Sequence, residues 1–399
     1  MIINKNYEIQ SCDDAELHIK RTSKLEYRIT YDDSKEMKAI VFVIGGHGVN
    51  NDINFLDQTR HCLTSNFNVV TINVFYQCFS ARPSMNFKYN PRIMPTDLDL
   101  HRFKVIMSEL GINTEHINRS NYFDCVYDID RQLDKNREYI KHDLSFFADI
   151  IPPNNEYQNY GIMAAIDHIN ALKDIVKRFP QFKNLPKIYG GGSYGGYLAL
   201  MCAKIAPWYV DGVIDNSGEA VPILQCIIGR DMNMGEFVFN GKNIKMITFV
   251  KNFWTRKNEN SPFFFSDEFY LIRNLLNSTH LLLQHQKNSN ILLVSYHSNF
   301  DYLTFAKHKI QLMQILKQLN YDTTFHLIEE KDIDGKYIKN LDHGCGITDK
   351  ALFKKELPLM LEKLKDKKFI IKEDSISYPC KNKVFTFKDE DDKFILEII

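Results

Sequence analysis

The sequence predicts an α/β protein built on a doubly wound, mostly parallel β-sheet. Short, continuously apolar segments recur along the chain, which is typical of strands that are buried on both faces of a parallel sheet. Amphipathic segments of helical length separate them, and this alternation favours helices on both faces of the sheet. We expect strands at 39–44, 68–74, 187–189, 210–215, 291–296 and 323–328, and helices at 55–65, 162–179, 197–203, 305–319 and 350–365.

Two stretches interrupt this alternation. Residues 77–155 combine several prolines with a charged run, and we expect a cap-like insertion there with helices at 98–110 and 137–150. Residues 221–288 are irregular and rich in aromatic side chains, which predicts a second cap-like insertion. Strand-like patterns near the N-terminus and at 367–399 predict extra β-structure at both ends. The whole 399-residue chain is therefore expected to form one α/β domain with two insertions.

Composition and charge narrow the class of protein. Lys and Arg together number 50, as do Asp and Glu, so no basic excess points to nucleic acid or to an anionic membrane surface. The chain has no signal-peptide core and no apolar run long enough to span a membrane. Eight scattered cysteines without a C-x-x-C pair suit reduced thiols in the cytoplasm. We expect neither a metal nor an organic cofactor, since the sequence has no ligand cluster and no phosphate-binding glycine loop.

The segment Gly191–Gly195 reads G-x-S-x-G and stands between an expected strand and an expected helix. A serine on such a tight turn has a strained backbone, and small neighbours make that backbone conformation accessible. Its hydroxyl is then exposed at the sheet edge beside the free N–H groups of the helix start. This context favours Ser193 as a nucleophile. The alternative is a glycine-rich turn that packs a helix on a sheet, in which the serine has no chemical role.

Candidates for an acid and a base follow at the ends of later strands. Asp301 lies in the loop after the strand at 291–296, and His343 lies in the loop after the strand at 323–328. In a doubly wound sheet these loops meet at the carboxyl edge of the strands. The order Ser193, Asp301, His343 suits a triad in which the histidine takes the serine proton and the aspartate orients the imidazole.

Two rival assignments stay open. Asp215, at the end of the strand at 210–215, is the alternative acid, because it lies one strand earlier at the same edge. His297 is the alternative base, although it precedes Asp301 in the chain and so breaks the expected order.

An oxyanion hole is expected from two backbone N–H groups. The first belongs to Tyr194, the residue after the nucleophile. The second should come from the glycine-rich loop that follows the strand at 39–44, where His47 and Gly48 are the candidates and Val49 is a further alternative.

These motifs carry a family resemblance. The stretch Gly191–Leu200 (GGSYGGYLAL) resembles the α/β-hydrolase superfamily, and within it the prolyl-oligopeptidase-like and esterase branch. The loops that hold Asp301 (SNFD) and His343 (DHG) are similar to the acid and base loops of that branch. The whole chain also resembles a hydrolase-like family of flagellated epsilon-class bacteria. The resemblance implies an α/β-hydrolase fold and a serine hydrolase.

The sequence therefore predicts a serine hydrolase that cleaves a small-molecule acyl ester, an acylated sugar among the candidates. A peptidase or amidase and an acyltransferase would use the same triad, so both stay open. A non-catalytic binding protein on a hydrolase scaffold is the alternative from another class. The oligomeric state is not predicted.

Overall fold

The structure is a computed structural model of the 399-residue chain, and two compact units make it up. The first unit comprises residues 1–79, 159–222 and 266–399, and the second comprises residues 80–158 and 223–265. The residues that the structure describes are 1–47, 53–81, 84, 86–135, 144–365, 367, 369–370 and 372–399.

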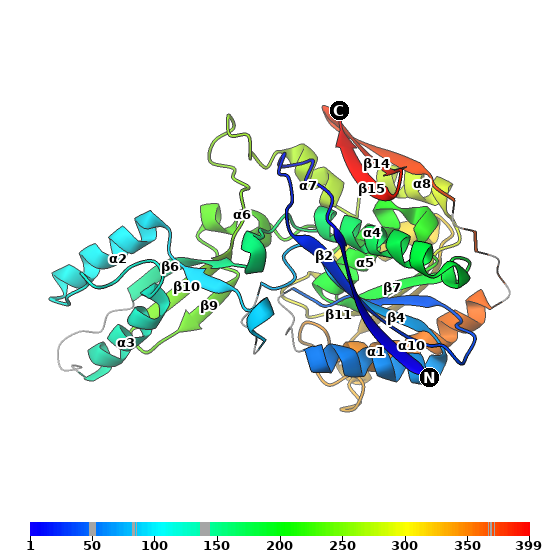
Figure 1. Ribbon diagram of the computed structural model, residues 1–399, viewed down its shortest axis with the longest axis horizontal. Coiled ribbons are helices and arrows are strands. Elements are labelled where there is room, and N and C mark those ends of the chain that lie inside the picture. Colours follow the sequence, from blue (N-terminus) through cyan, green and yellow to red (C-terminus); the bar gives the residue numbers. More distant parts are fainter. Residues whose placement is uncertain are drawn as a thin grey trace. The chain divides into compact units, whose positions relative to one another are not determined.

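The first unit is built on an eight-stranded sheet with the strand order β1-β2-β4-β3-β7-β8-β11-β12 (Figure 1). From β4 to β12 neighbouring strands pair in parallel, and β1 and β2 add two antiparallel strands at one edge. All four residues of β3 are buried, as an apolar strand covered on both faces requires. The predicted α/β class is therefore confirmed, and the strand order is that of the α/β-hydrolase fold. The strands are β1 (Ile2–Gln10), β2 (Lys24–Asp32), β3 (Ile40–Val43), β4 (Val70–Phe75), β7 (Lys187–Gly192), β8 (Gly212–Asn216), β11 (Leu292–Ser298) and β12 (Asp322–Ile328).

Helices cover both faces of this sheet. In Figure 1, α1 and α10 lie below the sheet, whereas α4 and α5 lie above it. Every residue of α5 is buried, which explains why its sequence is apolar on nearly all sides. The helices of this unit are α1 (Ile53–Phe67), α4 (Ile162–Arg178), α5 (Tyr194–Ile205), α7 (Asp267–Arg273), α8 (Ser278–Lys287), α9 (Ala306–Gln318) and α10 (Asp349–Leu364).

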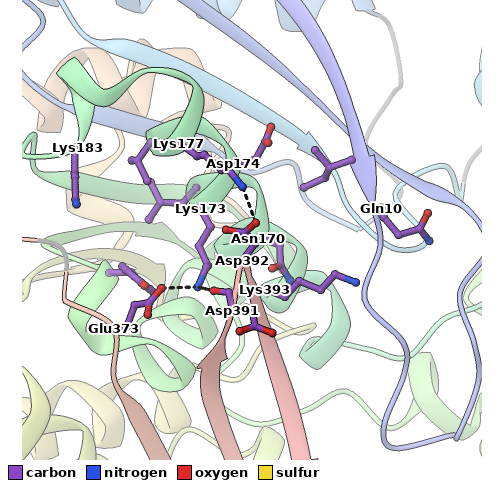
Figure 2. Close-up of a pocket in the computed structure, with 14 residues that line it drawn as sticks. Gln10, Asn170, Lys173, Asp174, Lys177, Lys183, Glu373, Asp391, Asp392 and Lys393 are labelled. Carbon is purple, nitrogen blue, oxygen red and sulfur yellow. Dashed lines mark hydrogen bonds and ion pairs between the residues drawn. The ribbon is translucent and has the colours of Figure 1, made fainter.

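The predicted β-structure at the C-terminus is a separate three-stranded sheet that packs on α4. The backbone N–H and C=O of Phe394 both hydrogen-bond to the side chain of Asn170. Figure 2 shows two ion pairs from the same helix, Lys173 with Glu373 at 3.3 Å and Lys177 with Asp392 at 2.6 Å. They border a surface pocket of about 520 Å³. The strands are β13 (Ser375–Cys380), β14 (Lys383–Glu390) and β15 (Lys393–Ile398).

The second unit joins two distant segments of the chain in one four-stranded sheet, with the order β5-β6-β10-β9. Its central strands, β6 and β10, pair in parallel, with Leu144 opposite Ile244. Aliphatic and aromatic side chains form its core, where the ring of Phe103 contacts the rings of Tyr122 and Phe146. The elements are β5 (Arg92–Met94), α2 (Asp97–Glu109), α3 (Tyr122–Lys135), β6 (Leu144–Ile151), α6 (Gln225–Met232), β9 (Phe237–Asn240) and β10 (Ile244–Val250).

The structure corrects one predicted element of this unit. The helix expected at 137–150 is wrong for residues 144–150, which form strand β6, and residues 137–143 fall outside the described residues. Phe146, Ala148 and Ile150 are all fully buried, and this period of two belongs to a strand.

The predicted insertions at 77–155 and 221–288 overlap the second unit, although residues 266–288 lie in the first. Their action as caps stays a prediction.

None of the helices in the described part of the chain combines the length and apolar character that a membrane crossing requires.

Candidate active site

Ser193 lies on a tight turn between β7, which ends at Gly192, and α5, which begins at Tyr194. Its backbone has φ 55° and ψ −129°, a conformation that costs energy for a residue with a Cβ. A Cβ on Gly191 or on Gly195 would collide with the backbone carbonyl oxygen of Ile44. The two flanking glycines are therefore required by the close approach of the loop after β3.

Three side chains form a continuous hydrogen-bonded line in the first unit. The Nε2 atom of His343 lies 2.7 Å from the Oγ atom of Ser193. The Nδ1 atom of the same imidazole lies 2.8 Å from the Oδ2 atom of Asp301. The three residues come from loops after β7, β11 and β12, so the carboxyl edge of the sheet brings them together.

Asp301 is held rigidly by its own loop. Its Oδ1 atom accepts hydrogen bonds from the backbone N–H groups of Leu303 at 2.9 Å and Thr304 at 3.0 Å. Its Oδ2 atom accepts from the Thr304 hydroxyl at 2.8 Å as well as from His343. The Asp301 side chain is fully buried, so these four contacts replace its hydration.

The loop that holds His343 is tied to the end of β8. The backbone N–H of Gly344 donates to the Ser217 hydroxyl at 3.1 Å, and its C=O accepts from the Asn216 amide at 2.9 Å. These bonds fix the imidazole between its two partners.

The pKa values of the acid and the imidazole move apart. Burial alone would raise the pKa of Asp301, but hydrogen bonds from His343 and Thr304 outweigh it and lower this pKa. Burial alone would lower the pKa of His343, but the Asp301 carboxylate outweighs it and raises this pKa. Charge on the imidazole is thus stabilised, as a general base requires during proton transfer.

The two rival residues have other partners. The Oδ2 atom of Asp215 lies 2.6 Å from Lys309 Nζ and 2.6 Å from the Ser295 hydroxyl, so this carboxylate belongs to a buried ion pair. His297 is 1% exposed, and its Nε2 atom lies 2.6 Å from the backbone C=O of Thr304. Neither side chain hydrogen-bonds to Ser193 or to His343 in the described part of the chain.

The expected oxyanion hole is described in part. Tyr194 begins α5, where the first N–H groups of a helix have no partner within it. His47 follows β3, and its ring meets the Tyr194 ring edge-on at 5.8 Å between centroids. Gly48 and Val49, the other candidates in this loop, lie outside the described residues.

Two polar side chains that the sequence analysis did not select lie near this site. The Glu219 carboxylate accepts a hydrogen bond from the Tyr160 hydroxyl at 2.8 Å, and it interacts electrostatically with His343. The Tyr160 ring packs on the Tyr194 ring at 5.1 Å between centroids. The sequence could have indicated Glu219 as a site residue because it follows strand β8 at the same edge of the sheet. Among the residues that the structure describes, neither unit by itself brings three His, Cys, Asp or Glu side chains close enough together to bind one metal ion.

The chain belongs to the sequence family described as "Protein of unknown function (DUF2920)", which matches residues 5–398. No curated protein matches the sequence at a significant level.

Solved structures of two kinds are similar to the chain. One is an acylaminoacyl peptidase in complex with Z-Gly-Gly-Phe-chloromethyl ketone, at 13% identity over 94% of this chain and 43% of that one, with a TM-score of 0.47. A puromycin-hydrolyzing peptidase of Mycobacterium tuberculosis matches at 11% identity over 90% of this chain and 38% of that one, with a TM-score of 0.43. A cold-adapted esterase from an Arctic intertidal metagenomic library matches at 8% identity over 90% and 94%, with a TM-score of 0.40.

The chain spans less than half the length of either peptidase. At these identities and TM-scores the likeness says nothing of function, which is inferred below from the geometry of the site. The bacterial group expected from the sequence stays a prediction.

Proposed function

We propose that this protein is a serine hydrolase that cleaves an acyl ester through a covalent acyl-enzyme. The observation that carries the proposal is the line of two hydrogen bonds, 2.7 Å from Ser193 to His343 and 2.8 Å from His343 to Asp301. Such a line activates a hydroxyl that is a weak nucleophile at its ordinary pKa.

Acylation begins when Ser193 Oγ attacks the ester carbonyl carbon and its proton passes to Nε2 of His343. The Asp301 carboxylate stabilises the resulting imidazolium and keeps Nδ1 protonated. As the tetrahedral intermediate collapses, the C–O bond to the alcohol breaks and the imidazolium protonates the leaving oxygen. A water molecule then repeats the sequence on the acyl-enzyme, which releases the carboxylic acid and restores Ser193.

The oxyanion of each tetrahedral intermediate is assigned to the backbone N–H of Tyr194 and to one from the loop after β3, at His47 or Gly48. The start of α5 supports the first assignment, because helix N-termini stabilise negative charge. Apart from the attacking water, every group in this mechanism comes from the chain itself, so the proposal requires no metal or organic cofactor.

We propose esters rather than amides as substrates because an alcohol is a better leaving group than an amine. The same catalytic side chains therefore face a lower activation barrier with an ester. Acylated sugars are included as substrates. The test is hydrolysis of p-nitrophenyl esters of graded acyl length by the wild type and by Ser193→Ala, with peptide amides and added alcohols as competing substrates. Turnover of short esters that disappears in Ser193→Ala is expected. Turnover of amides alone would replace the esterase with an amidase, and acyl transfer to alcohols in preference to water would replace it with an acyltransferase.

A further inference from the structure

Glu219 is a buried carboxylate beside the proposed active site, and no lysine or arginine of the described residues pairs with it. We infer that Glu219 forms a subsite for a protonated amino group carried by the substrate, so that the hydrolase prefers cationic esters. This inference rests on the proposed function, and it adds a substrate class to it.

The segment that holds Glu219 is fixed against the His343 loop. Glu219 follows β8 by three residues, and Asn216 and Ser217 at the start of this segment hydrogen-bond to Gly344. The carboxylate interacts electrostatically with the imidazoles of His343 and His47. It therefore lies close to the groups that would act on the scissile bond.

One oxygen of this carboxylate is buried without a hydrogen-bond donor among the described residues. The Oε1 atom accepts from the Tyr160 hydroxyl at 2.8 Å, and that ring packs on the ring of Tyr194, the residue after Ser193. The Oε2 atom has no hydrogen-bond partner among the described residues, although the residue is only 4% exposed. A buried acceptor without a donor costs free energy, and binding of a donor would recover it.

Three other buried acids of the first unit each have a basic side chain as partner. Asp301 contacts the imidazole of His343 at 2.8 Å, and Asp215 contacts Lys309 at 2.6 Å. Glu16 lies 2.6 Å from the guanidinium of Arg273. By comparison, the Glu219 carboxylate receives the Tyr160 hydroxyl and its own backbone N–H, and both of these donors are neutral. Burial of this group raises its pKa, which reflects the same lack of compensating positive charge.

A substrate ammonium matches the unpaired Oε2 atom in both charge and hydrogen bonding. It would donate to Oε2 and neutralise the carboxylate, and such charge-assisted bonds are among the strongest in proteins. A site with an unpaired buried polar group also discriminates against analogues that lack the complementary donor. We expect a preference of roughly 10- to 100-fold in kcat/KM for a cationic ester over its isosteric neutral analogue.

The test compares isosteric ester pairs at pH 7. Naphthyl esters of glycine, β-alanine and 4-aminobutanoate are paired with those of propanoate, butanoate and pentanoate, which samples three distances on the acyl side. A 2-aminoethyl and n-propyl ester pair samples the alcohol side. In the wild type at least one pair should show the preference, and Glu219→Gln should reduce that ratio by roughly 10- to 100-fold. Glu219→Asp keeps the charge and should retain part of the preference.

Glu356→Gln is the matched control. Glu356 is also a buried glutamate that accepts a tyrosine hydroxyl, from Tyr296 at 2.5 Å. Its substitution repeats the chemical change away from the site, so the ratio should equal that of the wild type. The wild type alone gives a second measurement, in which n-butylammonium should inhibit a neutral ester competitively and at least about tenfold more strongly than n-pentanol.

The outcomes separate the two proposals. Turnover of neutral esters with a ratio near one in every pair, together with equal inhibition by butylammonium and pentanol, overturns the subsite and leaves the hydrolase standing. A Glu219→Gln variant that slows all esters equally, or that only shifts the pH profile, also overturns it, because Glu219 would then act on His343. Absence of turnover on every ester overturns the proposed function and this inference with it.

Discussion

Asp301→Asn should abolish most of the activity by reversing the tautomer of His343. The Oδ1 position of Asp301 faces two backbone N–H donors, from Leu303 and Thr304, so the amide oxygen of the variant must stay there. The amide nitrogen then takes the Oδ2 position and donates toward Nδ1 of His343. The imidazole consequently carries its proton on Nε2, where Ser193 needs an acceptor.

The expected loss is large and depends on pH. A wrong tautomer in such a triad costs roughly 10⁴-fold in kcat, or about 5 kcal/mol in the activation barrier. In the wild type Asp301 raises the pKa of His343, so activity should be lost as the pH falls through a value above 6.5, the ordinary pKa of histidine. In the variant this limb of the pH profile should move to lower pH, because the negative charge of Asp301 no longer raises the pKa of His343.

The assay is kcat/KM for a short ester from pH 5 to 9, with protein folding checked by circular dichroism. Asp215→Asn is the informative comparison, because it leaves Lys309 buried without a counter-charge. That variant should lose about 3 to 5 kcal/mol of stability and keep its rate per folded molecule. Asp392→Asn is the neutral control, because this side chain is 76% exposed and its surface ion pair with Lys177 contributes little to stability. A loss smaller than tenfold in Asp301→Asn, or a larger loss in Asp215→Asn after correction for folding, would refute the assignment of the acid.

Two further predictions concern packing and pH. Gly195→Ala should prevent the tight turn at Ser193 from forming and remove all reactivity of Ser193, because the added Cβ collides with the Ile44 carbonyl oxygen. In Gly335→Ala the added Cβ meets nothing within 4 Å, so this variant should stay reactive and lose only about 1 to 2 kcal/mol of stability for its positive φ. Thermal melts of both variants would show the difference. Burial lowers the pKa of His168 to about 4, below its value of about 6.5 in an unfolded chain. The unfolded state therefore binds the proton first, and the free energy of unfolding should fall by up to about 3 kcal/mol as the pH drops from 6.5 to 4. Denaturation of His168→Leu across this range should show a smaller slope, and an equal slope would contradict the assignment.

The sequence predicts the main sheet and the three aligned side chains because those features depend on local patterns. Apolar runs mark the parallel strands, and the rule that loops meet at the carboxyl edge brings Ser193, Asp301 and His343 to one place. The same rule selects Asp215 equally well. Its partner Lys309 lies 94 residues away, and a contact between such distant residues has no local sequence signal.

Long-range contacts also explain the features that the sequence does not predict. Residues 144–150 were expected to be helical, but they pair in parallel with β10, about 100 residues later in the chain. Glu219 lies in a short polar segment. Nothing in that segment indicates that its carboxylate is buried with one oxygen lacking a hydrogen-bond partner. Burial is decided by tertiary packing, so this subsite could be inferred only from the structure.

Whether Ser193 is an activated nucleophile is decided by fluorophosphonate labelling read by intact mass. We expect one covalent adduct on the wild type, no adduct on Ser193→Ala, and much slower labelling of Asp301→Asn than of Asp215→Asn. A folded wild-type protein that stays unlabelled, or a Ser193→Ala variant that labels at the same rate, would contradict it and favour a binding protein on a hydrolase scaffold.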